Sequence, residues 1–153
     1  MNAKQYLLQS VKIRESLFYI RERIEKLESD LGYHPIQLDD TGASHLNVRE
    51  DKLSEKLAEV ADLESEWKAK RIELERKNEE IRELIETLDN PTYRAVMSYR
   101  YIHENKQFPT RLNSWVAVAF KVGLSNEDTA RIAHNRALKV LEKNISSVRK
   151  CSV

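Results

Sequence analysis

The chain has 153 residues, a formal net charge of +1 and 33% charged residues, with only three Gly, three Pro and one Cys. So few helix-breaking residues favour long helices, and the lack of any apolar run of 18 residues excludes a membrane-spanning helix. A single Cys cannot form an intrachain disulfide, and the first residues enter a charged helical pattern without the apolar core of a signal peptide. We therefore expect an all-α protein of the cytoplasm.

The first predicted helix covers residues 3–31. Its apolar residues recur at spacings of four and three, which places them on one narrow stripe that can pack along another helix. Gly32 is a suitable C-terminal cap, and Pro35 discourages continuation. The stripe comprises Ile13, Leu17, Ile20, Ile24, Leu27 and Leu31.

Residues 32–47 show no apolar periodicity and contain Gly, Pro, Asp, Ser and Asn, which predicts a loop. The loop holds His34 and His45 near Asp39 and Asp40, and these residue types can bind metals. Their spacing matches no common ligand pattern, so a solvated loop is the preferred interpretation and no metal site is expected.

A second helix is predicted from Asn47, which suits a capping box with Glu50, to about residue 88. A strict heptad line runs along it and predicts an antiparallel coiled coil with the first helix. Because the second helix is longer, residues 77–88 should overhang, and their apolar side chains need a cover. Either the C-terminal segment or a second chain could supply it, and we expect a homodimer. The heptad line, predicted as the oligomerisation surface, comprises Leu53, Val60, Trp67, Leu74, Ile81 and Leu88.

Residues 90–153, called the head below, predict three shorter helices. Asn90 and Pro91 begin the first, which ends near residue 103 and exposes Arg94 and Arg100. The second covers residues 110–121, and the third residues 126–148 after a turn at Gly123 and a capping box of Ser125 with Asp128. The buried face of the first is predicted to comprise Tyr93, Val96, Met97 and Tyr101.

Charge is divided unevenly between the two parts of the chain. Residues 1–90 hold 15 Lys and Arg against 21 Asp and Glu, whereas residues 91–153 hold 11 against 4. A basic head behind an acidic helical segment is typical of nucleic-acid binding. The predicted domains are accordingly a coiled-coil hairpin at 1–89 and a DNA-binding domain at 90–153.

A helix, a turn centred on Gly and a basic helix are the layout of a helix-turn-helix. Ala130, Ala133 and Ala137 would pack the last helix against the one before it, and the opposite face would meet DNA. Arg and Asn can read base edges, and Lys can meet phosphates. Glu127 and Asp128 at the start of this helix would repel phosphate. The predicted DNA-binding residues are Asn126, Arg131, His134, Asn135, Arg136 and Lys139.

Several segments resemble the small phage-encoded transcriptional regulators called ArpU-like or RinA-like, whose C-terminal part is similar to region 4 of bacterial sigma factors. They are residues 50–64, LDNPTYRAVMSYRYI at 88–102, SW at 114–115 with VGLS at 122–125, and HNRAL at 134–138. The chain is longer than the family between residues 102 and 114, and one residue longer between 125 and 134. This second difference leaves the register of Arg131 unassigned. The resemblance implies a regulator of phage late or packaging genes in a bacterial host.

The residues and the resemblance together predict a transcriptional regulator that binds double-stranded DNA and contacts host RNA polymerase. Two alternatives stay open: a coiled-coil adaptor or inhibitor of a host protein, and a DNA-packaging recognition subunit similar to a small terminase. The sequence has no phosphate-binding loop, no Gly-rich nucleotide turn and no cluster of metal ligands, so we expect neither an enzyme nor a cofactor.

Overall fold

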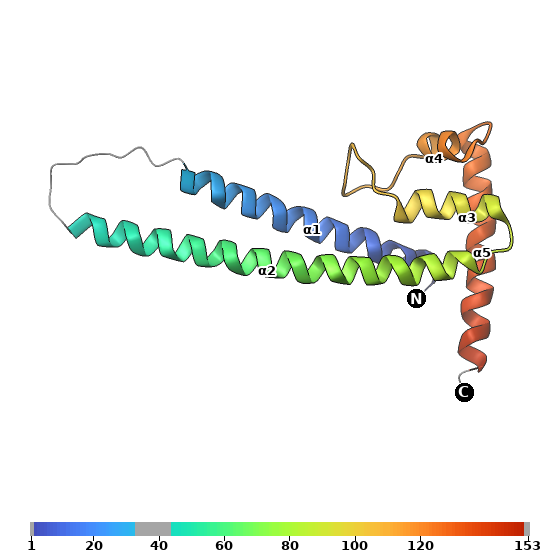
Figure 1. Cartoon of the computed structure of the whole chain (residues 1–153). Helices are drawn as coiled ribbons and strands as arrows, with labels where there is room; N and C mark the ends of the chain where they lie inside the picture. The colour runs from blue at the N-terminus through green and yellow to red at the C-terminus, as the bar shows by residue number, and fades with distance from the viewer. Residues whose placement is uncertain (1, 33–43, 152–153) are drawn as a thin grey trace. The chain divides into compact units, whose positions relative to one another are not determined.

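The computed structural model describes residues 2–32 and 44–151, and all regular structure in these ranges is helical, which confirms the predicted all-α class (Figure 1). No helix within them is long and apolar enough to cross a bilayer. The elements are α1 (Ala3–Gly32), α2 (Ser44–Glu86), α3 (Pro91–Met97), the π-helix η1 (Ser98–Ile102), α4 (Trp115–Val122) and α5 (Glu127–Cys151).

Contacts group the chain into two compact units. Unit 2 contains residues 16–72, and unit 1 contains the residues up to Glu15 together with those from Glu73 onward. This grouping places both ends of the predicted hairpin domain with the head. The boundaries between the two units therefore do not coincide with the predicted domain boundary between residues 89 and 90. That domain boundary stays a prediction.

The two long helices begin close to their predicted positions. α1 starts at Ala3 as predicted, and the Asn2 side chain caps it by accepting from the Gln5 amide at 2.8 Å. α2 starts at Ser44, so the predicted start and capping box at Asn47 are wrong. Most of the predicted loop, with His34, Asp39 and Asp40, lies outside the described residues.

Unit 2 is a pair of helical segments with a thin apolar contact. Leu27 of α1 and Val60 of α2 are buried, and the Arg23 guanidinium binds the Glu59 carboxylate at 2.9 Å between the helices. Two helices cannot enclose every apolar side chain that they carry. Among the side chains of this unit that the structure describes, large hydrophobic ones accordingly stay exposed at Tyr19, Leu53, Leu57 and Ile72.

The main core lies in unit 1, where five elements meet. The first turns of α1 and the last turns of α2 pack with α3, η1 and α5 around fully buried side chains. Burying one such aliphatic side chain contributes roughly 1.5–3 kcal/mol, so this cluster is the larger source of stability. Its buried members are Ala3, Leu7, Ile81, Ile85, Leu88, Met97, Tyr101, Ala137 and Leu141.

This core corrects the predicted overhang at residues 77–88. Tyr6 of α1 donates a hydrogen bond to Glu80 of α2 at 3.0 Å, so α1 reaches this part of α2. Ile81, Ile85 and Leu88 are covered by α1 and the head within one chain. These residues consequently provide no reason to expect a second chain.

The start of α1 is also bonded to the end of η1. The buried Ser10 hydroxyl and the buried Arg14 guanidinium both donate to the carbonyl of Tyr101. Burial lowers the pKa of Arg14, and the charge of Glu104 opposes that shift. A carbonyl at a helix end has no partner within its helix, so α1 supplies two donors to satisfy it.

The first helix of the head begins as predicted and ends in a wider turn. The Asn90 side chain accepts from the amides of Thr92 and Tyr93, which confirms the predicted cap. Of the predicted buried face, Val96, Met97 and Tyr101 are buried, and Tyr93 is partly buried. The last turn is the π-helix η1.

The predicted exposure of Arg94 and Arg100 is wrong. Both side chains are partly buried, because Arg94 donates to the Leu88 carbonyl at 3.2 Å and Arg100 lies over the Trp115 ring, 4.1 Å from its centroid. A guanidinium group can be buried in this way when its charge meets a carbonyl or an aromatic face.

The last two helices are joined by a four-residue turn. α4 starts after the Ser114 cap rather than at the predicted residue 110, and it ends at Val122 with Gly123 as its cap, whose φ of +79° lies in the left-handed region that favours Gly. The amide of Thr129 is capped by Asn126, so the predicted capping box of Ser125 with Asp128 is wrong. α5 then runs to Cys151.

Small residues let α5 pack closely on α4, as predicted. Ala130 and Ala133 are buried against Val118 and Ala119 of α4. Ala137, predicted for the same contact, lies instead in the main core. The stripe of small residues on α5 therefore serves two cores in succession.

Candidate nucleic-acid interface

The side of α5 away from its two cores carries most of the predicted DNA-binding residues. Asn135, Arg136 and Lys139 are exposed, and the side chain of Arg131 is half-exposed. Arg136 and Lys139 lie about one turn apart along the helix axis, and Arg131 precedes them by more than one turn. Exposed Arg, Asn and Lys side chains on one helix can reach base edges and phosphates together.

Arg131 is held by the acidic residues of the same helix. Its guanidinium lies 3.5 Å from Glu127 and 3.7 Å from Asp128. Ion pairs this exposed contribute at most about 1 kcal/mol to stability. A phosphate or a guanine can therefore replace the two carboxylates as the partner of Arg131. The two carboxylates strengthen the start of the helix and at the same time reduce the positive field there.

His134 does not lie on the exposed face that the sequence predicts. Its side chain is only 5% exposed, and its Nε2 atom is 2.8 Å from the Tyr101 hydroxyl. The ring also packs at 68° to the ring of Trp115, with centroids 4.9 Å apart. Burial lowers the pKa of His134, while a contact from its Nδ1 atom to Asn135 raises it. The residue is a core group and drops out of the set that can touch DNA.

Asn126 has a structural role that the sequence did not predict. Its Oδ1 atom accepts from both the amide and the hydroxyl of Thr129, at 2.9 and 2.8 Å. The side chain is thus fixed as the cap of α5. Its amide nitrogen is the part that could still contact DNA.

The predictions missed an ordered connection between η1 and α4, formed by residues 103–114 (Figure 1). The side-chain Oδ1 atom of Asn105 accepts from the amides of Gln107 and Phe108, both at 3.0 Å. Asn113 donates to the carbonyls of Tyr99 and His103, at 2.7 and 2.9 Å. In the sequence, two Asn residues flanking a short polar stretch were the available signal.

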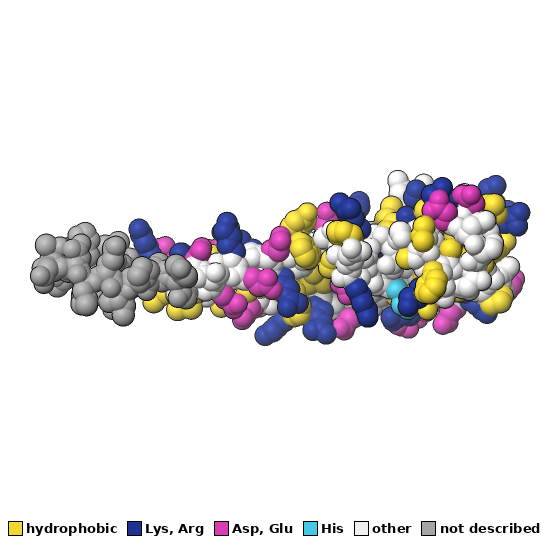
Figure 2. All heavy atoms as spheres, turned by 90° about the horizontal axis from the view of Figure 1, so that it is seen from above, with side chains coloured by type: hydrophobic (Ala, Val, Ile, Leu, Met, Phe, Trp, Pro, Cys, Tyr) yellow, Lys and Arg dark blue, Asp and Glu magenta, His cyan; other side chains and the backbone are white. Residues whose placement is uncertain are grey.

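One face of α4 is unusually apolar for an exposed surface. Phe120 is 82% exposed and Val116 64% exposed, and the two are one turn apart. Hydrophobic side chains are visible at the surface over the head in Figure 2, among Lys and Arg side chains. An aromatic ring left in water next to an aliphatic side chain favours a contact with another macromolecule.

The predicted oligomerisation line does not form one uniform surface. Leu53 is exposed and Val60 is buried, and Trp67 and Leu74 are partly buried. Ile81 and Leu88 are fully buried in the core of unit 1. On this line, apolar surface is left for a second chain at Leu53, Trp67 and Leu74.

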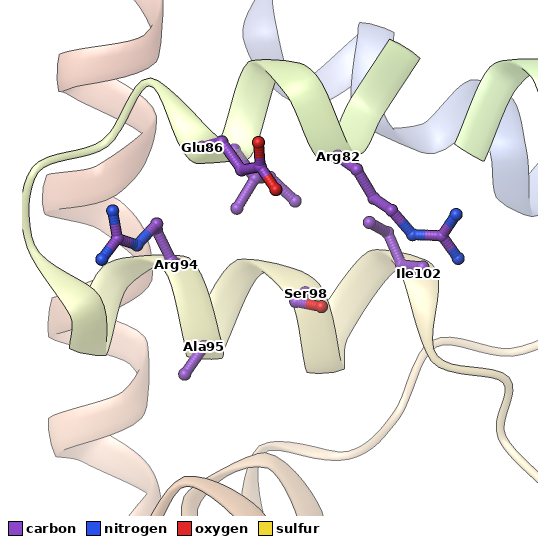
Figure 3. A pocket seen from close by; sticks show the side chains of 7 residues that line it. Arg82, Glu86, Arg94, Ala95, Ser98 and Ile102 are labelled. Carbon is purple, nitrogen blue, oxygen red and sulfur yellow. The ribbon is translucent and has the colours of Figure 1, made fainter. Parts of the chain in front are cut away.

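A cleft of about 610 Å³ lies between the end of α2 and the helix formed by α3 and η1 (Figure 3). The guanidinium groups of Arg82 and Arg94 lie at opposite ends of it, and Glu86 lies between them. Each Arg already has a partner, since Arg82 binds Glu79 and Arg94 binds the Leu88 carbonyl. The lining groups therefore do not converge on one ligand position.

Within the described ranges no three His, Cys, Asp or Glu residues come together as metal ligands do. The chain matches no protein-family model, no curated protein and no solved structure. Its function is consequently argued from the surface of the head.

Proposed function

We propose that the chain is a DNA-binding transcriptional regulator whose head docks α5 in the major groove as the second helix of a helix-turn-helix. The observation that carries the proposal is the exposed set Arg131, Arg136 and Lys139 on one helix that follows a Gly-centred turn. Such a helix, packed on a shorter one through small residues, has the form that enters the major groove.

The charge pattern supports this proposal. The head holds all of the net positive charge of the chain, and no Asp or Glu occurs from residue 105 to residue 126. Phosphate contacts dominate affinity for DNA, and a surface without carboxylates approaches phosphates at the lowest electrostatic cost.

In this proposal the long helices form an antiparallel coiled-coil hairpin that supplies dimerisation or a contact to host RNA polymerase. The resemblance to ArpU-like and RinA-like proteins would place the protein in the cytoplasm of a bacterium that carries a phage, acting on late or packaging genes.

The test is fluorescence anisotropy of a labelled random-sequence duplex against the full chain at several salt concentrations. We expect binding that weakens steeply with salt, with a slope of roughly −0.9 for each phosphate contacted. Replacing Arg131, Arg136 and Lys139 together with Glu should abolish it and leave the helical circular dichroism unchanged. A matched control replaces Lys26, Lys52 and Lys68, which are exposed on the acidic helices, with Glu. Equal losses in both triple variants would contradict the proposal.

A second candidate function is a protein-binding adaptor, and the exposed Phe120 and Val116 favour it. This surface would serve equally for a polymerase contact of a regulator. The Phe120→Ser variant separates the two candidates, because an adaptor loses its partner protein and has no DNA affinity to keep. A regulator keeps its DNA affinity and loses only binding to purified RNA polymerase.

A further inference from the structure

The connection between η1 and α4 has the construction of a contact element. Asn105 holds two amides at the start of the turn and also donates to the Leu112 carbonyl at 3.4 Å. The Arg111 amide donates to the Phe108 carbonyl at 2.9 Å. Asn113 closes the base against Tyr99 and His103. A loop that is fixed by its own side chains presents its tip without a large ordering cost on binding.

The tip of this loop is basic and aromatic. Lys106, Gln107 and Arg111 are exposed, and the Arg111 guanidinium lies over the ring of the exposed Phe108, 5.1 Å from its centroid. Glu104 precedes the tip, and its charge acts on the buried Arg14. The tip therefore presents two cations with no carboxylate beside them in the sequence.

The base of the loop is connected to the middle of α5. Arg100 donates to the Asn113 carbonyl and lies over Trp115, and the Trp115 ring packs at 68° to the ring of His134 in α5. The loop enters α4 directly, and α4 packs on α5. The loop is thus held to α5 through α4 and Trp115.

We infer that residues 105–112 form a second DNA-contacting element, in which Lys106 and Arg111 bind backbone phosphates beside the groove that α5 occupies. This inference rests on the proposed function and extends it from one helix to two surfaces. Contacts of this kind position a protein on the duplex and carry no sequence information of their own.

The test compares the full chain with its Lys106→Gln/Arg111→Gln variant in the same anisotropy titration. Losing two phosphate contacts should reduce the steepness of the plot of log affinity against log salt by about 1.8, which is on the order of a 60-fold loss at 0.1 M salt. The control variant Lys26→Gln/Lys52→Gln loses the same charge from exposed positions of α1 and α2 and should keep the steepness of the unaltered chain. Thermal melting of the tip variant should be unchanged, because the side chains of Asn105 and Asn113 remain.

The outcomes separate this inference from the proposed function. If the unaltered chain binds DNA and the tip variant keeps the same salt dependence and affinity, the loop inference is wrong and the role of α5 stands. If the tip and control variants lose affinity equally, a general charge effect replaces the loop contact. If the unaltered chain has no salt-dependent affinity for DNA, the proposed function and the loop inference are both wrong.

Discussion

His134 is the titratable residue on which the packing of the head depends. Its neutral ring accepts from the Tyr101 hydroxyl if Nδ1 donates to Asn135, and this arrangement satisfies both nitrogens. Burial raises the pKa of Tyr101 to about 12, so this hydroxyl keeps its proton. A protonated His134 would place an N–H donor opposite the O–H donor of Tyr101. Its positive charge would also be repelled by that of Arg100.

The stability of the protein should therefore fall as the solution becomes more acidic. Because the pKa of His134 is lower in the folded protein than its ordinary value near 6.5, the unfolded chain takes up the proton first. Stability is full above that value and decreases below it, by at most about 1.4 kcal/mol per pH unit for one proton. Urea unfolding at pH 7.5 and pH 5.5 measures the effect. The His134→Gln variant should show a smaller difference between the two pH values, and an equal difference would assign the pH dependence to another group.

The position of His134 was readable from its spacing but not from its type. It follows Ala130 by four residues and precedes Ala137 by three, which places it on the buried stripe of α5. A polar side chain next to Asn135 and Arg136 nevertheless suggested exposure. Its burial needs a partner from a distant helix, Tyr101, and α5 alone carries no signal of that pairing.

At the scale of one element, α2 has two different environments along its length. On the heptad line, Ile81 is fully buried in the core of unit 1, whereas Leu53 is 41% exposed in unit 2. A strict seven-residue repeat drifts by about 20° per heptad on a straight helix. The six positions of the heptad line therefore point in gradually different directions along α2. The sequence alone does not show which of them point into a core.

Ile81 and Ile72 provide a matched pair of one buried and one exposed position on α2. Ile81→Ala should lower the free energy of unfolding by about 3 kcal/mol, because it removes buried methyl groups and leaves a cavity. At a protein concentration low enough to keep the chain a monomer, Ile72→Ala should change it by less than about 0.5 kcal/mol, since the side chain is exposed within one chain. Both values come from urea denaturation followed by circular dichroism. A large loss for Ile72→Ala at that concentration would contradict its exposure within one chain.

The sequence also predicted the head unevenly. The caps at Asn90 and the turn at Gly123 were found, because a Pro after Asn and an isolated Gly are strong local signals. The start of α4 was placed too early, since residues 110–113 have no helix breaker of their own. Their conformation is set by hydrogen bonds from Asn105, Asn113 and Arg100, which connect parts of the chain that only the fold brings together.

At the scale of the whole molecule, composition and charge predicted more than the helical patterns did. The scarcity of Gly and Pro was enough for the all-α class. The separation of acidic and basic residues along the chain is the basis of the proposed DNA interface. Of the two covers that the sequence left open for the apolar side chains of residues 77–88, the structure shows the head, joined by the start of α1, whose part in the cover the sequence did not indicate.

A homodimer is nevertheless expected, from apolar surface in unit 2. Leu53, Leu57 and Ile72 are exposed on α2 within about 100° of arc on an ideal helix. Aliphatic side chains gathered on one side of a helix gain free energy when a second copy covers them. Sedimentation equilibrium of the full chain should therefore give the mass of two copies.

The double variant Leu57→Ser/Ile72→Ser should sediment as a single chain. Its circular dichroism should match that of the unaltered protein, because neither side chain is buried within one chain. If the unaltered protein sediments as one chain, the homodimer is wrong, and DNA binding by the head would have to proceed from one copy. A ring of eight or nine copies would favour the DNA-packaging alternative over a regulator, because large rings are what that alternative predicts. The mass of the assembly thus tests how many copies of the head bind one DNA duplex together.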